Sequence, residues 1–277
     1  MNQQWYWQTK SDYSYLTCDL LSSWQHGFFT AEFYPQTPSE LTNILQAKTK
    51  AYRVKQIHVN LVLTPQEILE VVNQENFHSS LAEADAVISD RPHQSVWVAS
   101  ADCTPVLIGD KVTGRVAAIH AGWRGTALKI VPEAIAKFLK FGSQLADLRI
   151  ALGPAISGKI YQVDEAVAIK VGRSIIADPQ NKPDAAILAE LEQLSPNPLL
   201  HDELPGKVRL DVPKINQIQL EQLNISSEQI AIAPYCTFQQ DQLQANGNHG
   251  FFSYRRTGEK KVQWSGIVAY ESKLSPS

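Results

Sequence analysis

Short stretches in which hydrophobic and polar residues alternate occur along the whole chain, and they predict many short β-strands. The first strands are expected before Tyr34 and end in the run from His26 to Thr30. Further strands are predicted at residues 53–63, 84–89, 95–101, 106–108, 115–120, 148–152 and 229–233, with a closing strand pair at 250–254 and 264–270. The turn from Gly109 to Gly114 is short, so the strands on either side of it should form an antiparallel hairpin.

A period near 3.6 residues predicts helices at residues 39–48, 126–141, 164–176 and 211–223, with a shorter helical run at 185–194. Ser39 is expected to cap the first of these. Thr64, Pro65 and Glu67 are typical of another helix start, because they combine a cap, a first-turn proline and a capping box. Pro132 lies inside the 126–141 pattern, so that helix should start later or kink.

Strands and helices are interleaved, yet hairpins are frequent, and this favours an α+β fold over a doubly wound parallel sheet. Residues 177–207 contain five prolines and, apart from 185–194, show no firm period. We interpret this stretch as an insertion or a lid. Strand signals resume after it, so we predict a single domain over residues 1–277.

Composition and charge are those of an ordinary globular protein, with 44% hydrophobic and 19% charged residues. The formal net charge is -3 and the isoelectric point is about 6.2, which argues against nucleic acid or an anionic membrane as a partner. Cys18, Cys103 and Cys236 are too few for a disulfide framework. With no secretory pattern and no apolar run of about 18 residues, we expect a soluble cytoplasmic protein.

Three residues have the chemistry of metal ligands. His58 lies in the predicted strand 53–63, Cys103 lies where a buried strand breaks, and His120 ends the hairpin before a glycine-rich turn. Two imidazoles and a thiolate suit Zn²⁺, and three protein ligands leave a fourth position open for water or substrate. Their separations are long and match no compact metal motif. The alternative therefore stays open that Cys103 is a small buried residue and both histidines are structural.

Several segments together resemble the YfiH family, also called the laccase-domain, polyphenol-oxidase-like or peptidoglycan-editing-factor family. The most specific are ADCTPVLIGD at residues 101–110 and AAIHAGWRGT at 117–126. The others are HGFFT at 26–30, LGPAISGKIYQV at 152–163, LDVPKINQIQLEQL at 210–223, PYCT at 234–237 and FFSYRRTG at 251–258. The resemblance therefore runs from about residue 26 to the C-terminus.

The resemblance implies a fold, a cofactor and an activity. The fold would be a layered α/β/β/α sandwich with mixed sheets, related to bacterial toxin cysteine hydrolases. One zinc ion would be bound by His58, Cys103 and His120. The activity would be phosphorolysis of adenosine, inosine, guanosine and methylthioadenosine, together with adenosine deamination and a link to editing of peptidoglycan precursors. The expected partners are a purine nucleoside and phosphate, and the expected state is a monomer.

The chain departs from the family pattern at three places. Thr30, Ala31 and Glu32 replace a Thr-Arg-x-Gly-Gly run, which removes an expected arginine and any substrate contact it made. Ala155 stands where a cysteine is frequent, and the pair at 261–262 replaces Gly-Arg. None of these changes affects the three proposed metal ligands.

Neighbours of the three ligands are the next candidates. Arg124 could hold phosphate by its planar guanidinium or form a structural ion pair. Trp123 could stack on a purine or belong to the core, and Asp102 could orient a ligand histidine or cap a turn. Arg255 and Arg256 are adjacent in a predicted strand and should face opposite ways, so at most one of them should enter the site. We take Cys103, His120 and Arg124 as the catalytic candidates, with Arg255 and Trp123 binding substrate.

The remaining histidines and cysteines are assigned no role. We expect surface positions for the histidines His26, His78, His93, His201 and His249, of which only His249, beside Gly250, could come near the site. Cys18 and Cys236 are expected to be buried thiols.

Three rival functions remain at this point. In a metal-free cysteine hydrolase, Cys103 would be the nucleophile and His120 its base. A copper polyphenol oxidase is disfavoured, because Met1 is the one methionine and no H-x-H pair exists for a copper cluster. The third rival is a non-enzymatic binding protein of cell-wall metabolism.

Overall fold

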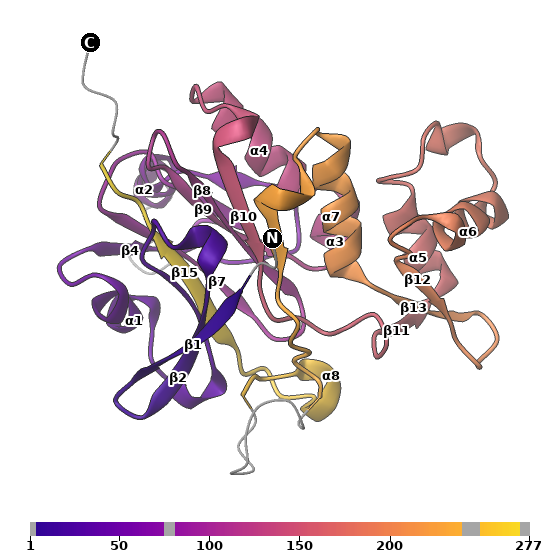
Figure 1. Cartoon of the computed structure of the whole chain (residues 1–277), viewed down its shortest axis with the longest axis horizontal. Helices are drawn as coiled ribbons and strands as arrows, with labels where there is room; N and C mark the ends of the chain where they lie inside the picture. Colours follow the sequence, from indigo (N-terminus) through magenta and orange to yellow (C-terminus); the bar gives the residue numbers. More distant parts are fainter. Residues whose placement is uncertain (1–3, 75–80, 240–249, 272–277) are drawn as a thin grey trace.

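Two six-stranded mixed sheets form the centre of the molecule (Figure 1). The computed structural model describes residues 4–74, 81–239 and 250–271. The first sheet has the order β1 (Trp5–Lys10), β2 (Tyr13–Cys18), β3 (His26–Phe29), β15 (Gln263–Val268), β7 (Gln94–Ser100) and β4 (Lys50–Tyr52). The second has the order β14 (Ile230–Ile232), β10 (Leu148–Leu152), β8 (Thr104–Asp110), β9 (Val116–Ala121), β6 (Ala86–Ile88) and β5 (Val62–Leu63).

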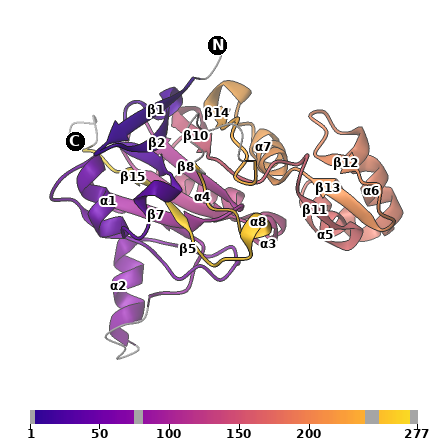
Figure 2. The same cartoon turned by 90° about the horizontal axis from the view of Figure 1, so that it is seen from below.

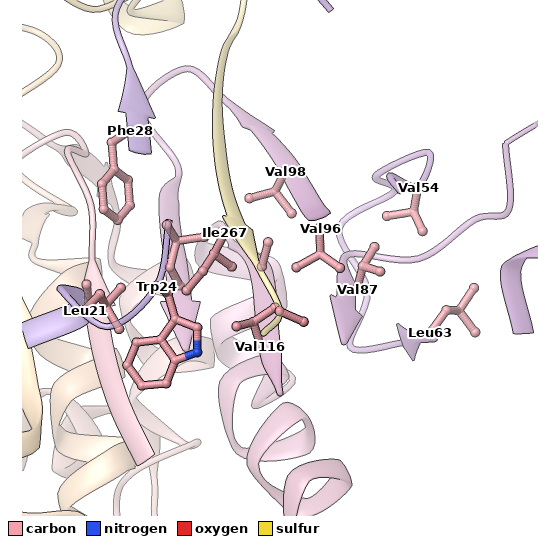
Figure 3. Close-up of a cluster of buried hydrophobic side chains, with 14 of the residues drawn as sticks. Leu21, Trp24, Phe28, Val54, Leu63, Val87, Val96, Val98, Val116 and Ile267 are labelled. Carbon is pink, nitrogen blue, oxygen red and sulfur yellow. The ribbon is translucent and has the colours of Figure 1, made fainter. Parts of the chain in front are cut away.

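Side-chain alternation along the central strands explains why the two sheets pack face to face. In β7, Val96 and Val98 point into the cluster between the sheets (Figure 3), whereas Trp97 packs in a separate cluster with α1 (Pro38–Leu45). In β9, Ala118 joins the inter-sheet cluster, while Ile119 faces α4 (Ile130–Lys140) and α7 (Val212–Gln222). The predicted α/β/β/α layering is therefore confirmed.

A smaller unit lies at one end of the molecule in both views (Figures 1 and 2). It has a three-stranded sheet in the order β11 (Gln162–Asp164), β13 (Lys207–Leu210) and β12 (Leu199–His201), with α5 (Glu165–Gly172) and α6 (Asp184–Gln193). Its hydrophobic cluster includes Ile215 of α7. The helix predicted at 185–194 is confirmed as α6; a single domain stays a prediction.

Several local signals in the sequence are confirmed. At the start of α2 (Pro65–Gln74), the Thr64 and Glu67 side chains each accept a hydrogen bond from the other residue's backbone N–H, at 3.1 and 2.7 Å. Strands β8 and β9 form the expected hairpin. Short 3₁₀ turns connect other elements at Asp19–Leu21, Ala31–Phe33, Leu145–Asp147, Pro179–Asn181 and Ser227–Gln229. In the part of the chain that the structure describes, no helix is long and apolar enough to cross a membrane.

Two helix boundaries differ from the prediction. The first helix is capped by Thr37 rather than Ser39, because Glu40 completes a capping box with Thr37. The predicted helix 126–141 is divided into α3 (Trp123–Ala127) and α4. The break is at Lys129, whose left-handed backbone (φ 62°) cannot continue an α-helix. Pro132 then falls in the first turn of α4, where proline is tolerated.

Two predicted strands are wrong in part. Within residues 53–63, only Val62–Leu63 belongs to a strand, β5. Residues 250–254 do not pair with β15, because β3 occupies one edge of β15 and β7 the other. The chain forms the short helix α8 (Tyr254–Thr257) instead, and its N-terminus is capped by the Ser253 hydroxyl, which accepts a hydrogen bond from the Arg256 backbone N–H at 3.2 Å.

Candidate metal centre

His58, Cys103 and His120 lie together although they come from three separate segments of the chain. One potential ligand atom from each lies within 4.8 Å of the other two. The two imidazole rings are nearly perpendicular, with an interplanar angle of 82° and centroids 4.9 Å apart. This is the convergence that a shared metal ion requires.

The hairpin register places Cys103 beside His120. Strand β8 begins at Thr104, which pairs with Ala121, and the next pair joins Pro105 to His120. Because the two strands are antiparallel, the start of β8 meets the end of β9. Cys103 directly precedes β8 and therefore lies at the same end of the hairpin as His120.

His58 lies in a loop between β4 and β5, not in the strand that alternation predicted. Its backbone has a left-handed conformation with φ 64°, which no strand residue adopts. The backbone N–H groups of Ile57 and Val59 donate to Oδ2 of Asp85 at 3.1 and 2.8 Å. These two hydrogen bonds hold the loop in a shape that a β-ladder would not allow.

Asp85 is the important residue that the sequence analysis missed. Its Oδ1 lies 2.8 Å from Nδ1 of His120, and its side chain is fully buried. With Nδ1 engaged, Nε2 of His120 is the nitrogen left for a metal. The signal in the sequence is a carboxylate inside an otherwise small and apolar run, since buried carboxylates are rare unless they are paired.

Asp102 does not orient a histidine. Its carboxylate accepts hydrogen bonds from Oγ1 of Thr237 and from the backbone N–H of Arg255, both at 2.7 Å. It therefore joins the segment before β8 to two later parts of the chain.

The charged groups of the site stabilise one another. Burial raises the pKa of the Cys103 thiol, but His120 and His58 outweigh burial and bring that pKa below its usual value. Burial lowers the pKa of His120, yet the Cys103 thiolate and the Asp85 carboxylate raise it overall. Burial opposes ionisation of Asp85 as well, and hydrogen bonds from His120, Val59 and Ile57 bring its pKa below the ordinary value. The two histidines therefore favour the thiolate form of Cys103.

All three candidate ligands line one cavity of about 470 Å³, a volume within the range of small-molecule sites. Four basic residues also line it: Arg53, Lys55, Lys260 and Lys261. Tyr254 and Trp264 add aromatic surface, and the Arg53 guanidinium lies 5.4 Å from the centre of the Trp264 ring. The cavity therefore combines metal-ligating, cationic and aromatic groups.

The other sequence candidates lie around a smaller cavity of about 30 Å³, and Cys103 lines both cavities. Trp123 and Tyr161 line the smaller one. Arg124 is exposed and stacks on Trp123 at 4.5 Å, while Arg255 stacks on Tyr161 at 5.0 Å. Across residues 4–74, 81–239 and 250–271 Arg124 forms no ion pair. The alternative that Arg124 makes a structural ion pair therefore has no support in these residues.

Arg255 and Arg256 occupy helix α8 rather than a strand, which corrects their predicted geometry. Arg256 donates to three backbone carbonyls, those of Thr237, Phe238 and Phe251, at 2.7 to 3.0 Å. It is therefore structural. Arg255 donates to the carbonyl of Gln162 at 2.9 Å and remains exposed.

The other histidines and cysteines mostly follow expectation. His26 is the exception, because it is 6% exposed and its Nε2 accepts from the backbone N–H of Cys18 at 2.8 Å. His93 and His201 are exposed, and His78 and His249 lie outside the described residues. Cys18 and Cys236 are buried free thiols, as predicted.

Comparisons with known proteins identify a family model and several relatives that match most of the chain. A family model described as multi-copper polyphenol oxidoreductase laccase matches residues 36–269. A Synechocystis protein named purine nucleoside phosphorylase slr1573 is 53% identical over 266 residues, which cover 96% of this chain and 97% of that protein. A purine nucleoside phosphorylase of Bacteroides thetaiotaomicron is 31% identical over 189 residues, or 68% of this chain and 61% of that protein.

Two crystal structures share the architecture. YfiH of Bacillus licheniformis has a TM-score of 0.75 at 22% identity, covering 95% of this chain and 98% of that one. YlmD of Geobacillus stearothermophilus has a TM-score of 0.72 at 20% identity, covering 96% and 99%. The chain thus belongs to the multi-copper polyphenol oxidoreductase laccase family, also known as the YfiH family.

Proposed function

We propose that this protein is a zinc-dependent purine nucleoside phosphorylase that accepts adenosine, inosine, guanosine and methylthioadenosine and also deaminates adenosine. The observation that carries the proposal is the convergence of His58, Cys103 and His120 on the wall of a cavity that four basic residues also line. The name shared by curated relatives, one of them 53% identical over nearly the whole chain, supports the reaction class.

The donor set fits zinc. His58, Cys103 and His120 would hold the ion through two imidazole nitrogens and one thiolate, a set that structural chemistry associates with Zn²⁺. A blue-copper site commonly adds a weak axial methionine, and the one methionine of this chain is Met1. When bound, zinc would supply Lewis acidity at a coordination position open to substrate.

The basic wall of the larger cavity would bind the phosphate. Lys55 and Lys261 form ion pairs with Glu83 and Glu259, at 2.8 and 3.1 Å. Within the described residues Arg53 has no such carboxylate partner, so its guanidinium is free to bind a phosphate oxygen. Lys260, which lines the same cavity, is likewise without an ion pair in that part of the chain.

Aromatic groups would bind the nucleoside. Tyr254 and Trp264 offer ring faces in the larger cavity, where a purine could stack. Trp123 also lines the smaller cavity that shares Cys103, and Arg124 and Arg255 stack on two aromatic residues of that cavity, Trp123 and Tyr161. We assign Trp123 and Arg255 to substrate binding and Arg124 to catalysis, acting from the smaller cavity on substrates held in the larger one.

The two reactions differ in the nucleophile. In phosphorolysis, a phosphate oxygen forms a bond to the anomeric carbon of ribose, the glycosidic C–N bond breaks, and the purine leaves with the bonding electrons and takes up a proton. In deamination, water adds to the purine carbon that carries the amine, and ammonia leaves. Cationic groups beside the cavity favour the first reaction, because phosphate and the transition state are both negatively charged.

A metal-free cysteine hydrolase is the second candidate. The observation that favours it is the hydrogen bond and charge interaction between Cys103 and His120. Metal analysis separates the two, since a thiolate bound to stoichiometric zinc is a poor nucleophile. A role in editing peptidoglycan precursors, or in binding a partner of wall metabolism, rests on the family resemblance alone.

Product analysis with adenosine and phosphate tests the proposal. Wild type should contain one zinc per chain and release adenine and ribose 1-phosphate, with some inosine from deamination. His120→Ala should lose both zinc and product, while His93→Ala, an exposed histidine outside the cavity, should keep both. Unchanged adenosine with zinc-loaded wild type, or equal product from His120→Ala, would refute the proposal. Release of adenine and free ribose by metal-stripped wild type, independent of phosphate, would instead favour the cysteine hydrolase.

A further inference from the structure

One carboxylate, that of Asp85, is bonded to both histidine segments of the metal site. Its Oδ1 contacts Nδ1 of His120 at 2.8 Å, and its Oδ2 accepts from the backbone N–H groups of Ile57 and Val59, the two neighbours of His58. Its backbone carbonyl also accepts from the backbone N–H of His120 at 2.8 Å. Asp85 therefore contacts the chain at four points around two of the three ligands.

We infer that Asp85 is a positioning residue that sets the metal site in advance, by selecting the tautomer of His120 and by clamping the loop that carries His58. The inference rests on the proposed metal site and goes beyond it. Asp85 itself need not touch the ion or the substrate. Apart from Cys103, it is the one side chain in the described segments that hydrogen-bonds a ring of the three ligands.

The His120 contact decides which ring nitrogen is available. A carboxylate can only accept, so Nδ1 of a neutral His120 ring must carry the proton that Asp85 receives. Nε2 is then unprotonated and can bind a cation. Carboxylate–histidine–metal chains of this kind fix ring orientation as well as tautomer.

The hydrogen bonds between Asp85 and the two neighbours of His58 hold the loop in a conformation that it would not otherwise keep. His58 has a φ of 64°, and the left-handed region is unfavourable for a residue with a Cβ atom. Both adjacent N–H groups donate to Oδ2 of Asp85, which is buried with the rest of that side chain. Without this acceptor, two backbone donors would lose their partner and the loop would relax away from Cys103.

The variant Asp85→Asn separates these effects from simple loss of packing. Its one amide oxygen can serve either the two backbone donors or His120. If it faces Ile57 and Val59, the amide NH₂ faces Nδ1 of His120, which must then accept. The ring proton moves to Nε2, and His120 cannot bind zinc through that atom.

Asp110→Asn is the matched control. Asp110 is equally buried, lies in β8 of the same hairpin, and accepts backbone hydrogen bonds from Val112 and Thr113 at 2.8 and 3.0 Å. It touches none of the three ligands. Both substitutions should lower thermal stability, but only the one at Asp85 should change the metal site.

The test measures zinc affinity by competition with a chromophoric chelator, together with ¹⁵N spectra of the histidine rings of the metal-free protein at a pH at which the His120 ring is neutral. We expect Asp85→Asn to weaken zinc binding roughly 10- to 100-fold and to lose the Nδ1–H signal of His120. Asp110→Asn should match wild type in both. Wild-type affinity in Asp85→Asn, or an unchanged Nδ1–H signal, would overturn the inference.

A measurement on wild type covers the case in which Asp85→Asn does not fold. The amide hydrogens of Ile57 and Val59 should exchange slowly with solvent in both the metal-free and the zinc-loaded protein, although they lie in a loop. Exchange at the rate of an open loop would refute the clamp. A wild-type protein that binds no zinc, yet protects these amides, would contradict the proposed metal site and leave the clamp intact.

Discussion

Gly122 packs directly against the sulfur of Cys103: a Cβ atom added at Gly122 would lie only 2.8 Å from Sγ. The backbone of Gly122 has φ -70°, so any residue could adopt its conformation, and only the close contact explains a need for glycine. The turn after β9 thus determines how much room the thiolate has.

Gly122→Ala should therefore displace Cys103 and weaken zinc binding. We expect a loss of about tenfold or more, the size typical of mutations at residues that support metal ligands. Gly125→Ala, within α3, is the milder comparison, because its Cβ atom would lie 3.3–3.4 Å from Ile130 and from the carbonyl oxygens of His120 and Val59. Chelator competition measures both. Equal zinc affinity in the two variants would mean that the sulfur can move without cost.

Arg53→Ala should raise the KM for phosphate without changing zinc content. Arg53 lines the larger cavity and is exposed, so we expect an effect of about 1 kcal/mol or less, roughly a fivefold change at most. The effect should shrink as ionic strength rises. Arg91→Ala, an exposed arginine outside this cavity, should leave the KM unchanged. An unaltered KM in Arg53→Ala would place the phosphate elsewhere.

The adjacent arginines of α8 should behave differently when each is replaced by alanine. Arg256→Ala leaves three backbone carbonyls without their charged donor and should cost about 2 kcal/mol, or roughly 4–8 °C in Tm. Arg255→Ala removes an exposed side chain that stacks on Tyr161, so it should raise the KM for the nucleoside and leave Tm within a degree or two. Thermal unfolding and steady-state kinetics on both variants check this contrast. The reverse pattern would show that Arg255 is the structural residue.

His26 should make stability depend on pH. Burial lowers its pKa from 6.5 to about 4, and the hydrogen bond that Nδ1 donates to the Trp24 carbonyl offsets only part of this effect. The unfolded chain therefore binds a proton at a higher pH than the folded one, and stability falls as pH decreases from about 6.5 to 4. The total loss should be about 3 kcal/mol.

Urea unfolding at several pH values, on wild type and His26→Gln, measures this dependence. The glutamine side chain can accept from Cys18 and donate to Trp24 but does not titrate, so the slope between pH 6.5 and 4 should flatten. His93→Gln, at an exposed histidine, should keep the wild-type slope. A steep slope that persists in His26→Gln would assign it to other groups.

Local patterns in the sequence were sufficient for most of the regular structure. The capping box at Thr64 and Glu67, the hairpin before His120 and the helix at 185–194 follow from contacts between residues near each other in the chain, so they could be predicted. The family resemblance in residues 101–126 supplied the layered fold and the ligand set. It could do so because a specific run of residues reflects a whole structure that other members share.

Long-range contacts decided the rest. Alternation predicted a strand around His58, but two hydrogen bonds to Asp85, 26 and 28 positions further along the chain, set a left-handed loop there. A strand was also predicted before Arg255, but both edges of β15 were already paired, which only the assembled sheet could reveal.

The chain by itself determined which residue types could bind a metal and where its strands and helices would form, because periodicity and side-chain chemistry are local properties. Only the tertiary structure decided that Asp85 is bonded to both histidine segments and that Arg53 shares a cavity with Cys103. The physical reason is that these contacts are made by sheets and loops that meet in space, and no local pattern records which segments will meet.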